Sequence, residues 1–101
     1  MRKTSRIKVT EADLREQIRT LCKLFGWRMQ FTWSSIHSPA GFPDLVLVNP
    51  EQKRIIFAEL KSEVGKMSEQ QIEWMKALVD AGAAYYTWRP ADIETIAEIL
   101  K

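Results

Sequence analysis

Apolar side chains recur with helical spacing in three segments of the chain, residues 11–25, 68–81 and 90–100. In the first segment they fall at i, i+3, i+4 and i+7 positions, between an N-cap residue, Thr10, and a glycine stop, Gly26. The third opens with a proline, which is favoured in a first helical turn. This spacing predicts three amphipathic helices.

Between the helices, short apolar or alternating runs predict four strands and two connections. The predicted strands are residues 27–33, 44–48, 54–61 and 83–88, with a loop over 34–43 and a turn over 49–52. The tight turn predicts a hairpin between the second and third strands. The later strand, helix and strand sequence predicts a parallel pair. The expected fold is an α/β domain with a mixed sheet and a C-terminal helix.

Composition narrows this picture to one globular domain over residues 1–101, with a basic, flexible segment over residues 1–9. The chain is 46% hydrophobic and 28% charged, and its one cysteine, Cys22, excludes an internal disulfide and is expected in the core. No run of apolar residues is long enough for a membrane span or a secretory signal, so we expect a cytoplasmic protein. Residues 1–50 hold eight Lys or Arg against four acids, which fits either a nucleic-acid partner or a merely solvated tail.

Charged residues interrupt the apolar strands at their ends. Glu59 and Lys61 lie on one face of their strand, about 6.6 Å apart at ~3.3 Å per residue. Ile55 and Phe57 share that face and are expected to be buried, which argues against an exposed ion pair. A hairpin would lay Asp44 opposite the end that holds Glu59 and Lys61, so we expect two carboxylates and an ammonium to meet there, although Asp44 alone also suits a turn.

Two further polar residues fall at inward positions near helix starts. Glu11 lies within the apolar stripe of the first helix, whereas Glu16 points away; Glu11 is either a site residue or a first-turn acid at the rim. Gln71 lies on the apolar side of the second helix, whereas Gln70 faces outward. Its spacing from Ser68 also matches a capping box, and both roles can hold at once.

Carboxylate oxygens gathered at a dry sheet end suit Mg²⁺ or Mn²⁺, which bind one to three carboxylates and a substrate phosphate. A lysine beside such an ion can hold the attacking water and offset charge that develops on the phosphate. This combination points to phosphodiester hydrolysis.

These motifs resemble the PD-(D/E)xK nuclease superfamily and, within it, the stand-alone VRR-NUC domains of phages and bacteria. The matching residues are Gly41-Phe42-Pro43-Asp44, Glu59-Leu60-Lys61, Met67-Ser68 with Gln71, Gly26 and Gly82. The resemblance implies a restriction-endonuclease-like αβββαβ core. It also implies that Asp44, Glu59 and the Leu60 carbonyl hold the ion and Lys61 positions the water. Glu11 would serve a second ion or its waters, and Gln71 would support the site.

The same resemblance implies a Holliday junction resolvase that acts on DNA as a homodimer, without an organic cofactor, in a bacterial host cell. Two alternatives stay open: a flap, end-processing or nicking nuclease of the same fold, and a catalytically silent DNA-binding module. Residues expected to contact DNA, each of which is equally a solvated side chain, are Arg28, His37, Ser38, Lys66 and Arg89.

Overall fold

The structure, a computed structural model, describes residues 9–32 and 40–101 of the chain. Its elements follow the predicted order: α1 (Glu11–Phe25), β1 (Arg28–Phe31), β2 (Leu45–Asn49), β3 (Arg54–Leu60), α2 (Glu69–Asp80), β4 (Ala84–Trp88) and α3 (Ile93–Leu100). The closing helix differs from the prediction in one respect, because it is preceded by a 3-10 turn, Pro90–Asp92. In the described part of the chain, no helix is long and apolar enough to cross a membrane.

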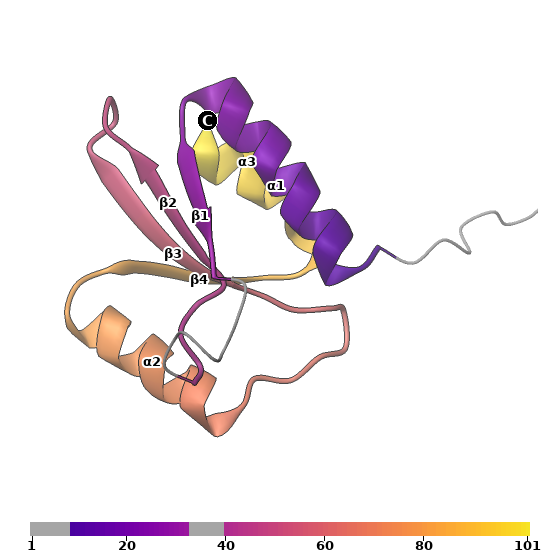
Figure 1. Ribbon diagram of the computed structural model, residues 1–101, viewed down its shortest axis with the longest axis vertical. Helices are drawn as coiled ribbons and strands as arrows, with labels where there is room; N and C mark the ends of the chain where they lie inside the picture. Colours follow the sequence, from indigo (N-terminus) through magenta and orange to yellow (C-terminus); the bar gives the residue numbers. More distant parts are fainter. Residues whose placement is uncertain (1–8, 33–39) are drawn as a thin grey trace, which may run out of the picture.

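The four strands form one mixed sheet in the order β1-β2-β3-β4 (Figure 1). β1 pairs with β2 and β2 with β3 in antiparallel fashion, which confirms the predicted hairpin. β3 and β4 are parallel, as expected for strands joined through α2. The predicted α/β class and mixed sheet are therefore confirmed.

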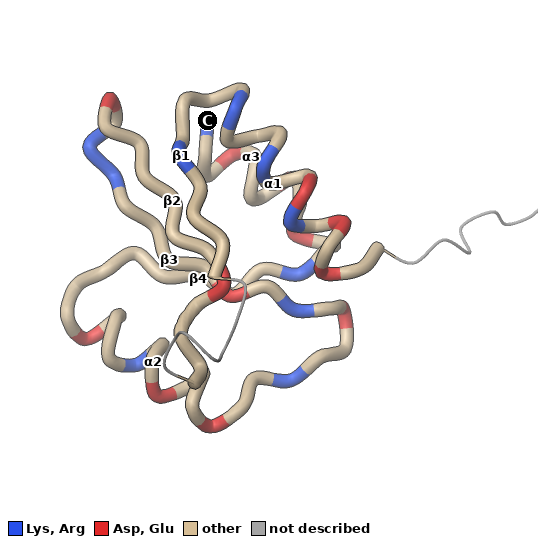
Figure 2. The backbone as a smooth tube through the Cα atoms, in the orientation of Figure 1, with Lys and Arg blue, Asp and Glu red and all other residues tan. Residues whose placement is uncertain are grey.

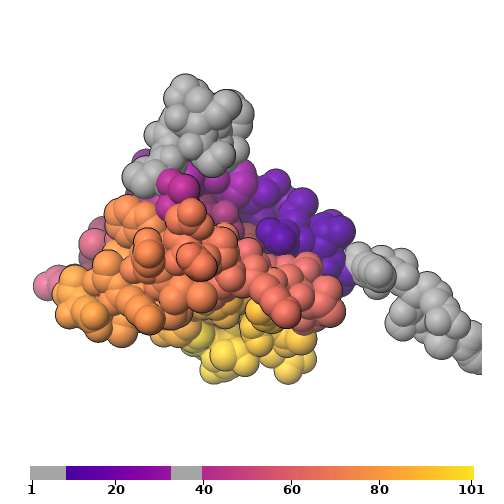
Figure 3. All heavy atoms as spheres, turned by 90° about the horizontal axis from the view of Figure 1, so that it is seen from below, coloured from indigo at the N-terminus to yellow at the C-terminus, as the bar shows by residue number. Residues whose placement is uncertain are grey.

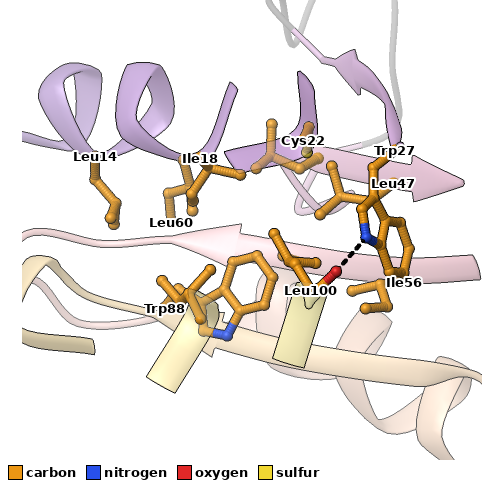
Figure 4. Close-up of a cluster of buried hydrophobic side chains, with 12 residues drawn as sticks. Leu14, Ile18, Cys22, Trp27, Leu47, Ile56, Leu60, Trp88 and Leu100 are labelled. Atoms are coloured by element: carbon orange, nitrogen blue, oxygen red, sulfur yellow. Dashed lines mark hydrogen bonds between the residues drawn. The ribbon is translucent and has the colours of Figure 1, made fainter. Parts of the chain in front are cut away.

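The main core lies between one face of the sheet and the pair α1 and α3 (Figures 1 and 4). Trp27 Nε1 donates a hydrogen bond of 2.8 Å to the Leu100 carbonyl, which fastens the last helix to the start of the sheet. Cys22 is buried, as predicted. Among the described residues, the buried members of this core are Leu14, Ile18, Cys22, Trp27, Leu45, Leu47, Ile56, Ala58, Leu60, Trp88, Ile96 and Leu100.

The opposite face of the sheet is covered more thinly, by α2. Every residue of α2 is at least partly exposed. An aromatic contact holds it to the sheet: the Phe42 ring packs edge-on against Trp74 at 5.0 Å and against Phe57 at 6.3 Å between centroids. The expectation that Ile55 is buried beside Phe57 is wrong, since Ile55 is 56% exposed. It lies next to the β2–β3 turn, which extends beyond α2 (Figure 1).

Candidate active site

The hairpin register brings the two predicted acids together. Leu45 pairs with Ala58, so the next position along each strand sets Asp44 opposite Glu59. Asp44 Oδ2 accepts a hydrogen bond of 2.9 Å from the Leu60 backbone N–H, which ties the carboxylate to β3 just beyond the last paired residue. Figure 2 shows the acidic positions at the start of β2 and the end of β3 meeting at one end of the sheet.

Glu59 is held by α2. Its side chain lies on the α2 side of the sheet, is only 2% exposed, and accepts a hydrogen bond of 2.7 Å at Oε2 from Gln71 Nε2. The Gln71 amide is itself oriented, because its Oε1 accepts from the Ser68 N–H at 2.8 Å. Ser68 Oγ in turn accepts from the Gln71 N–H at 3.1 Å. Gln71 is therefore both the second half of the capping box and a partner of the site carboxylate.

Replacing Gln71 with alanine is expected to destabilise the protein by about 1–2 kcal/mol, because it removes half of the capping box and a donor to a buried carboxyl group. Gln70→Ala changes the neighbouring exposed side chain and is the matched control, expected to leave stability within about 0.5 kcal/mol. Urea unfolding at neutral pH measures both. Equal effects from the two substitutions would contradict the bond to Glu59.

The surroundings of Glu59 disfavour its ionised form. Burial, together with the charge of the neighbouring Asp44 carboxylate, raises the pKa of Glu59 to about 8. The Lys61 ammonium opposes this shift, while Glu11 adds to it. At neutral pH the pair therefore favours a shared proton or a bound cation over two negative charges.

The donor set fits a hard divalent cation. Glu59 Oε1 is buried and has no hydrogen-bond partner among the described residues, although buried carboxyl oxygens normally have one. It belongs to a carboxylate paired with a second one, the arrangement from which Mg²⁺ and Mn²⁺ sites are built. Within residues 9–32 and 40–101, no group of three or more His, Cys, Asp or Glu could hold a metal. The protein ligands expected here are thus Asp44 and Glu59, with the Leu60 carbonyl beside them.

Lys61 directly follows β3. Its N–H donates to the Trp88 carbonyl at 3.0 Å, which continues the parallel pairing with β4. The loop beyond it is fastened by Arg89, whose guanidinium donates to the Ser62 carbonyl at 2.6 Å, and by the Gly65 N–H, which donates to Ser62 Oγ at 3.0 Å. The backbone that carries Lys61 is therefore fixed on both sides. The charge of the Lys61 ammonium acts on Glu59.

Glu11 stands apart from the acid pair. It is exposed at the first turn of α1, so its place on the apolar stripe is at the rim. Figures 1 and 3 set the start of α1 beside the loop that follows Lys61. Its charge contributes to the raised pKa of Glu59, but it completes no three-acid group with Asp44 and Glu59. That Glu11 binds or orients a second ion or its waters stays a prediction.

The predicted DNA contacts separate into three groups. His37 and Ser38 lie outside the described residues. Thr32 lies beside the acids, because its N–H donates to the Asp44 carbonyl at 2.7 Å. Arg28 pairs with Val48 at the other end of β1, about 13 Å from Thr32 at ~3.3 Å per residue. Lys66 is exposed in the loop before α2, and Arg89 supports that loop through Ser62. Of the three described residues, Lys66 and Arg89 lie in or against the loop that follows Lys61, whereas Arg28 does not.

Two polar residues of β4 also face the acids and were missed from the sequence. Thr87 pairs with Glu59 and Tyr85 with Phe57, which sets both on the α2 side. The Thr87 hydroxyl lies 3.3 Å from the Tyr85 hydroxyl. Burial raises the pKa of Tyr85, and the charges of Glu59 and Asp44 add to that shift while the contact with Thr87 opposes it. The alternation of side chains along β4 places Tyr85 and Thr87 on one face. Only the register of β3 and β4 shows that this face is the one that carries Glu59.

Known proteins resemble this chain in sequence and in fold. The family model described as VRR-NUC domain matches residues 3–90. Among curated relatives, the Fanconi-associated nuclease 1 homologs of Schizosaccharomyces pombe and Caenorhabditis elegans are 40% identical over 45 residues and 41% identical over 46 residues. These matches cover 45% and 46% of this chain but only 6% and 5% of those proteins.

A solved structure described as a VRR_NUC domain shares the fold, with a TM-score of 0.73 at 19% identity, over 87% of this chain and 94% of that one. Archaeoglobus fulgidus Hjc, described as a Holliday junction resolvase, overlaps over 79% of this chain and 65% of its own with a TM-score of 0.49 at 23% identity, too low to add to the fold assignment. The family match spans most of the chain, and it includes Asp44, Glu59 and Lys61. The chain therefore belongs to the VRR-NUC family of nuclease domains.

Proposed function

We propose that this nuclease domain is a Mg²⁺- or Mn²⁺-dependent DNA endonuclease that cleaves four-way junctions. The observation that carries the proposal is the pair of Asp44 and the buried Glu59, in which the described residues leave Glu59 Oε1 without a hydrogen-bond partner. A structural ion pair would satisfy that oxygen with a protein donor. A site for a divalent cation leaves it free for the ion.

The ion would be held by the carboxylates of Asp44 and Glu59 and by the Leu60 carbonyl, with water and a substrate phosphate as further ligands. When bound, it supplies Lewis-acid stabilisation of the phosphate and lowers the pKa of bound water. Asp44 stays in place through the Leu60 N–H, and Glu59 through Gln71. Both acids are thus oriented before substrate arrives, which favours catalysis.

Lys61 acts on the attacking water and on the phosphate. Its ammonium, beside the acid pair, holds the attacking water and offsets negative charge that grows on the phosphate oxygens. The water oxygen bonds to phosphorus, the bond from phosphorus to the 3′ oxygen breaks, and that oxygen takes up the proton released by the water. The products are a 5′-phosphate and a 3′-hydroxyl.

The proposals of a junction substrate and of a homodimer rest on the number of active sites in each chain and on the charge of the chain. One chain contributes one site, and resolving a four-way junction takes two cuts, so two copies are required. The basic excess in residues 1–50 suits contact with phosphates, which carries no sequence information. Selectivity would then come from the shape of the paired sites.

Cleavage is expected to require a divalent cation. A labelled four-way junction incubated with the protein and Mg²⁺ or Mn²⁺ should give symmetric paired nicks; chelator should abolish them, and excess Mn²⁺ should restore them. Gel filtration at micromolar concentration should show a dimer. Trimmed ends would favour the flap or end-processing alternative, and a bound but uncut junction in Mn²⁺ would favour the silent module.

A further inference from the structure

Gly41 lies directly against the first turn of α2. A Cβ atom added at Gly41 would lie 2.4 Å from the carbonyl carbon of Gln70, 2.6 Å from its oxygen and 2.6 Å from the backbone nitrogen of Gln71. All three atoms belong to the helix backbone, so they move only if the helix moves. Gly41 also has φ +85°, which side chains other than asparagine rarely tolerate.

The next residue, Phe42, docks the same helix from the side. Its ring contacts Trp74 on α2 and Phe57 on β3. Every residue of α2 is at least partly exposed, and these ring contacts join the helix to β3. Pro43 is buried and links the pair directly to Asp44. One short segment therefore contacts α2 and presents the first carboxylate.

We propose that Gly41 and Phe42 are positioning residues of the active site, which set α2 at the distance where Gln71 reaches Glu59. Gly41 meets the backbone at Gln71, the capping box orients the Gln71 amide, and that amide donates to Glu59 Oε2 at 2.7 Å. Only the catalytic consequence rests on the proposed function. The bond between the two side chains is measurable without it.

The distances say how far the helix must move. Ordinary contact begins at 3.4 Å, so a Cβ now at 2.4 Å from the Gln70 carbonyl carbon requires a displacement of about 1 Å. The same displacement applied to the 2.7 Å bond gives about 3.7 Å, which is beyond hydrogen-bonding distance. Misplacement on this scale lowers rates by up to about 100-fold.

Gly82 offers a matched control at the other end of α2. Its φ is +90°, close to that of Gly41, but an added Cβ would meet nothing within 4 Å in the described structure. Gly82→Ala therefore reproduces the backbone strain without the contact. Asparagine separates the two causes further, because it tolerates this conformation. Gly82→Asn should recover the stability that Gly82→Ala loses, whereas Gly41→Asn should not restore the site.

The direct readout is the side-chain amide of Gln71, observed by ¹⁵N NMR. In Gly41→Ala its signals should move to the region of the exposed Gln70 amide, whereas in Gly82→Ala they should stay at their parental positions. The rise in melting temperature on adding Mn²⁺ should shrink only in Gly41→Ala. Its kcat for junction cleavage should fall about 10–100-fold with KM little changed, and adding Gly41→Ala to Gln71→Ala should cost no further activity.

Unchanged Gln71 signals in folded Gly41→Ala, with kcat equal to that of Gly82→Ala, would overturn the proposal. If Gly41→Ala does not fold, Phe42→Leu decides, since it loosens the same docking contact without forcing the backbones apart; a displaced Gln71 signal supports the proposal and an unchanged one refutes it. If the unmodified protein neither cleaves nor responds to Mn²⁺, the proposed function fails, and the Gln71 signals still decide this inference.

Discussion

Replacing Lys61 with alanine is expected to lower kcat for junction cleavage by about 10²–10³-fold, the usual effect of losing one group that stabilises transition-state charge. The ammonium follows β3 beside the acid pair, and the loop beyond it is fastened through Ser62 and Arg89. Because its role concerns the attacking water and charge that develops only during reaction, junction binding should change little.

Single-turnover cleavage in Mn²⁺ and gel-shift titration in chelator separate the two effects. Lys76→Ala, which removes an exposed ammonium from α2, is the matched control and should leave kcat within about two-fold. Lys61→Ala should also retain the Mn²⁺-dependent rise in melting temperature, since the lysine is no ligand. A variant that cuts normally, or that loses binding as much as cleavage, would remove Lys61 from this role.

The sequence was sufficient to predict that Asp44 and Glu59 meet, because the determining signals are local. A tight turn closes the β2–β3 hairpin, and a side-chain period of two then leaves no freedom about which residues oppose each other. Asp44 and Glu59 converge for that reason. Gln71 was found because a capping box has a fixed spacing of three residues.

The parts that could not be predicted depend on distances between elements. The contact between Gly41 and α2 exists only once the helix is docked, and the sequence showed that glycine only as a motif position. Tyr85 and Thr87 required the parallel register of β3 and β4, which no local turn sets. The exposure of Ile55 likewise depends on how far α2 extends over the sheet, and the spacing of apolar residues in the sequence does not predict that.

Replacing Glu59 with glutamine is expected to change activity and stability in opposite directions. Cleavage and the stabilisation by Mg²⁺ or Mn²⁺ should both be lost, because a neutral amide is a poor ligand beside a single remaining carboxylate. Without divalent cation the folded protein should nevertheless be more stable than its parent at alkaline pH. A carboxylate that is buried beside Asp44 costs free energy when it ionises, and glutamine never ionises.

The sign follows from the pKa of Glu59, which is about 8 when folded against an ordinary value of 4.5. Between these values the folded state binds more protons than the unfolded state, so the free energy of unfolding falls as pH rises from 4.5 toward 8 and levels off above it. The variant lacks this fall. The free energy of unfolding of Glu59→Gln should therefore equal that of the parent below pH 4.5 and exceed it by about 2–4 kcal/mol at about pH 9.

Urea unfolding in chelator across this pH range measures the effect, with Glu63→Gln, an exposed acid of the following loop, as the control expected to track the parent. If Glu59 were only a structural partner of Gln71, the substitution would lower stability at every pH and leave the response to Mn²⁺ intact. Greater stability joined to lost metal response is the signature of a carboxylate kept at a cost to the fold because the site needs its charge.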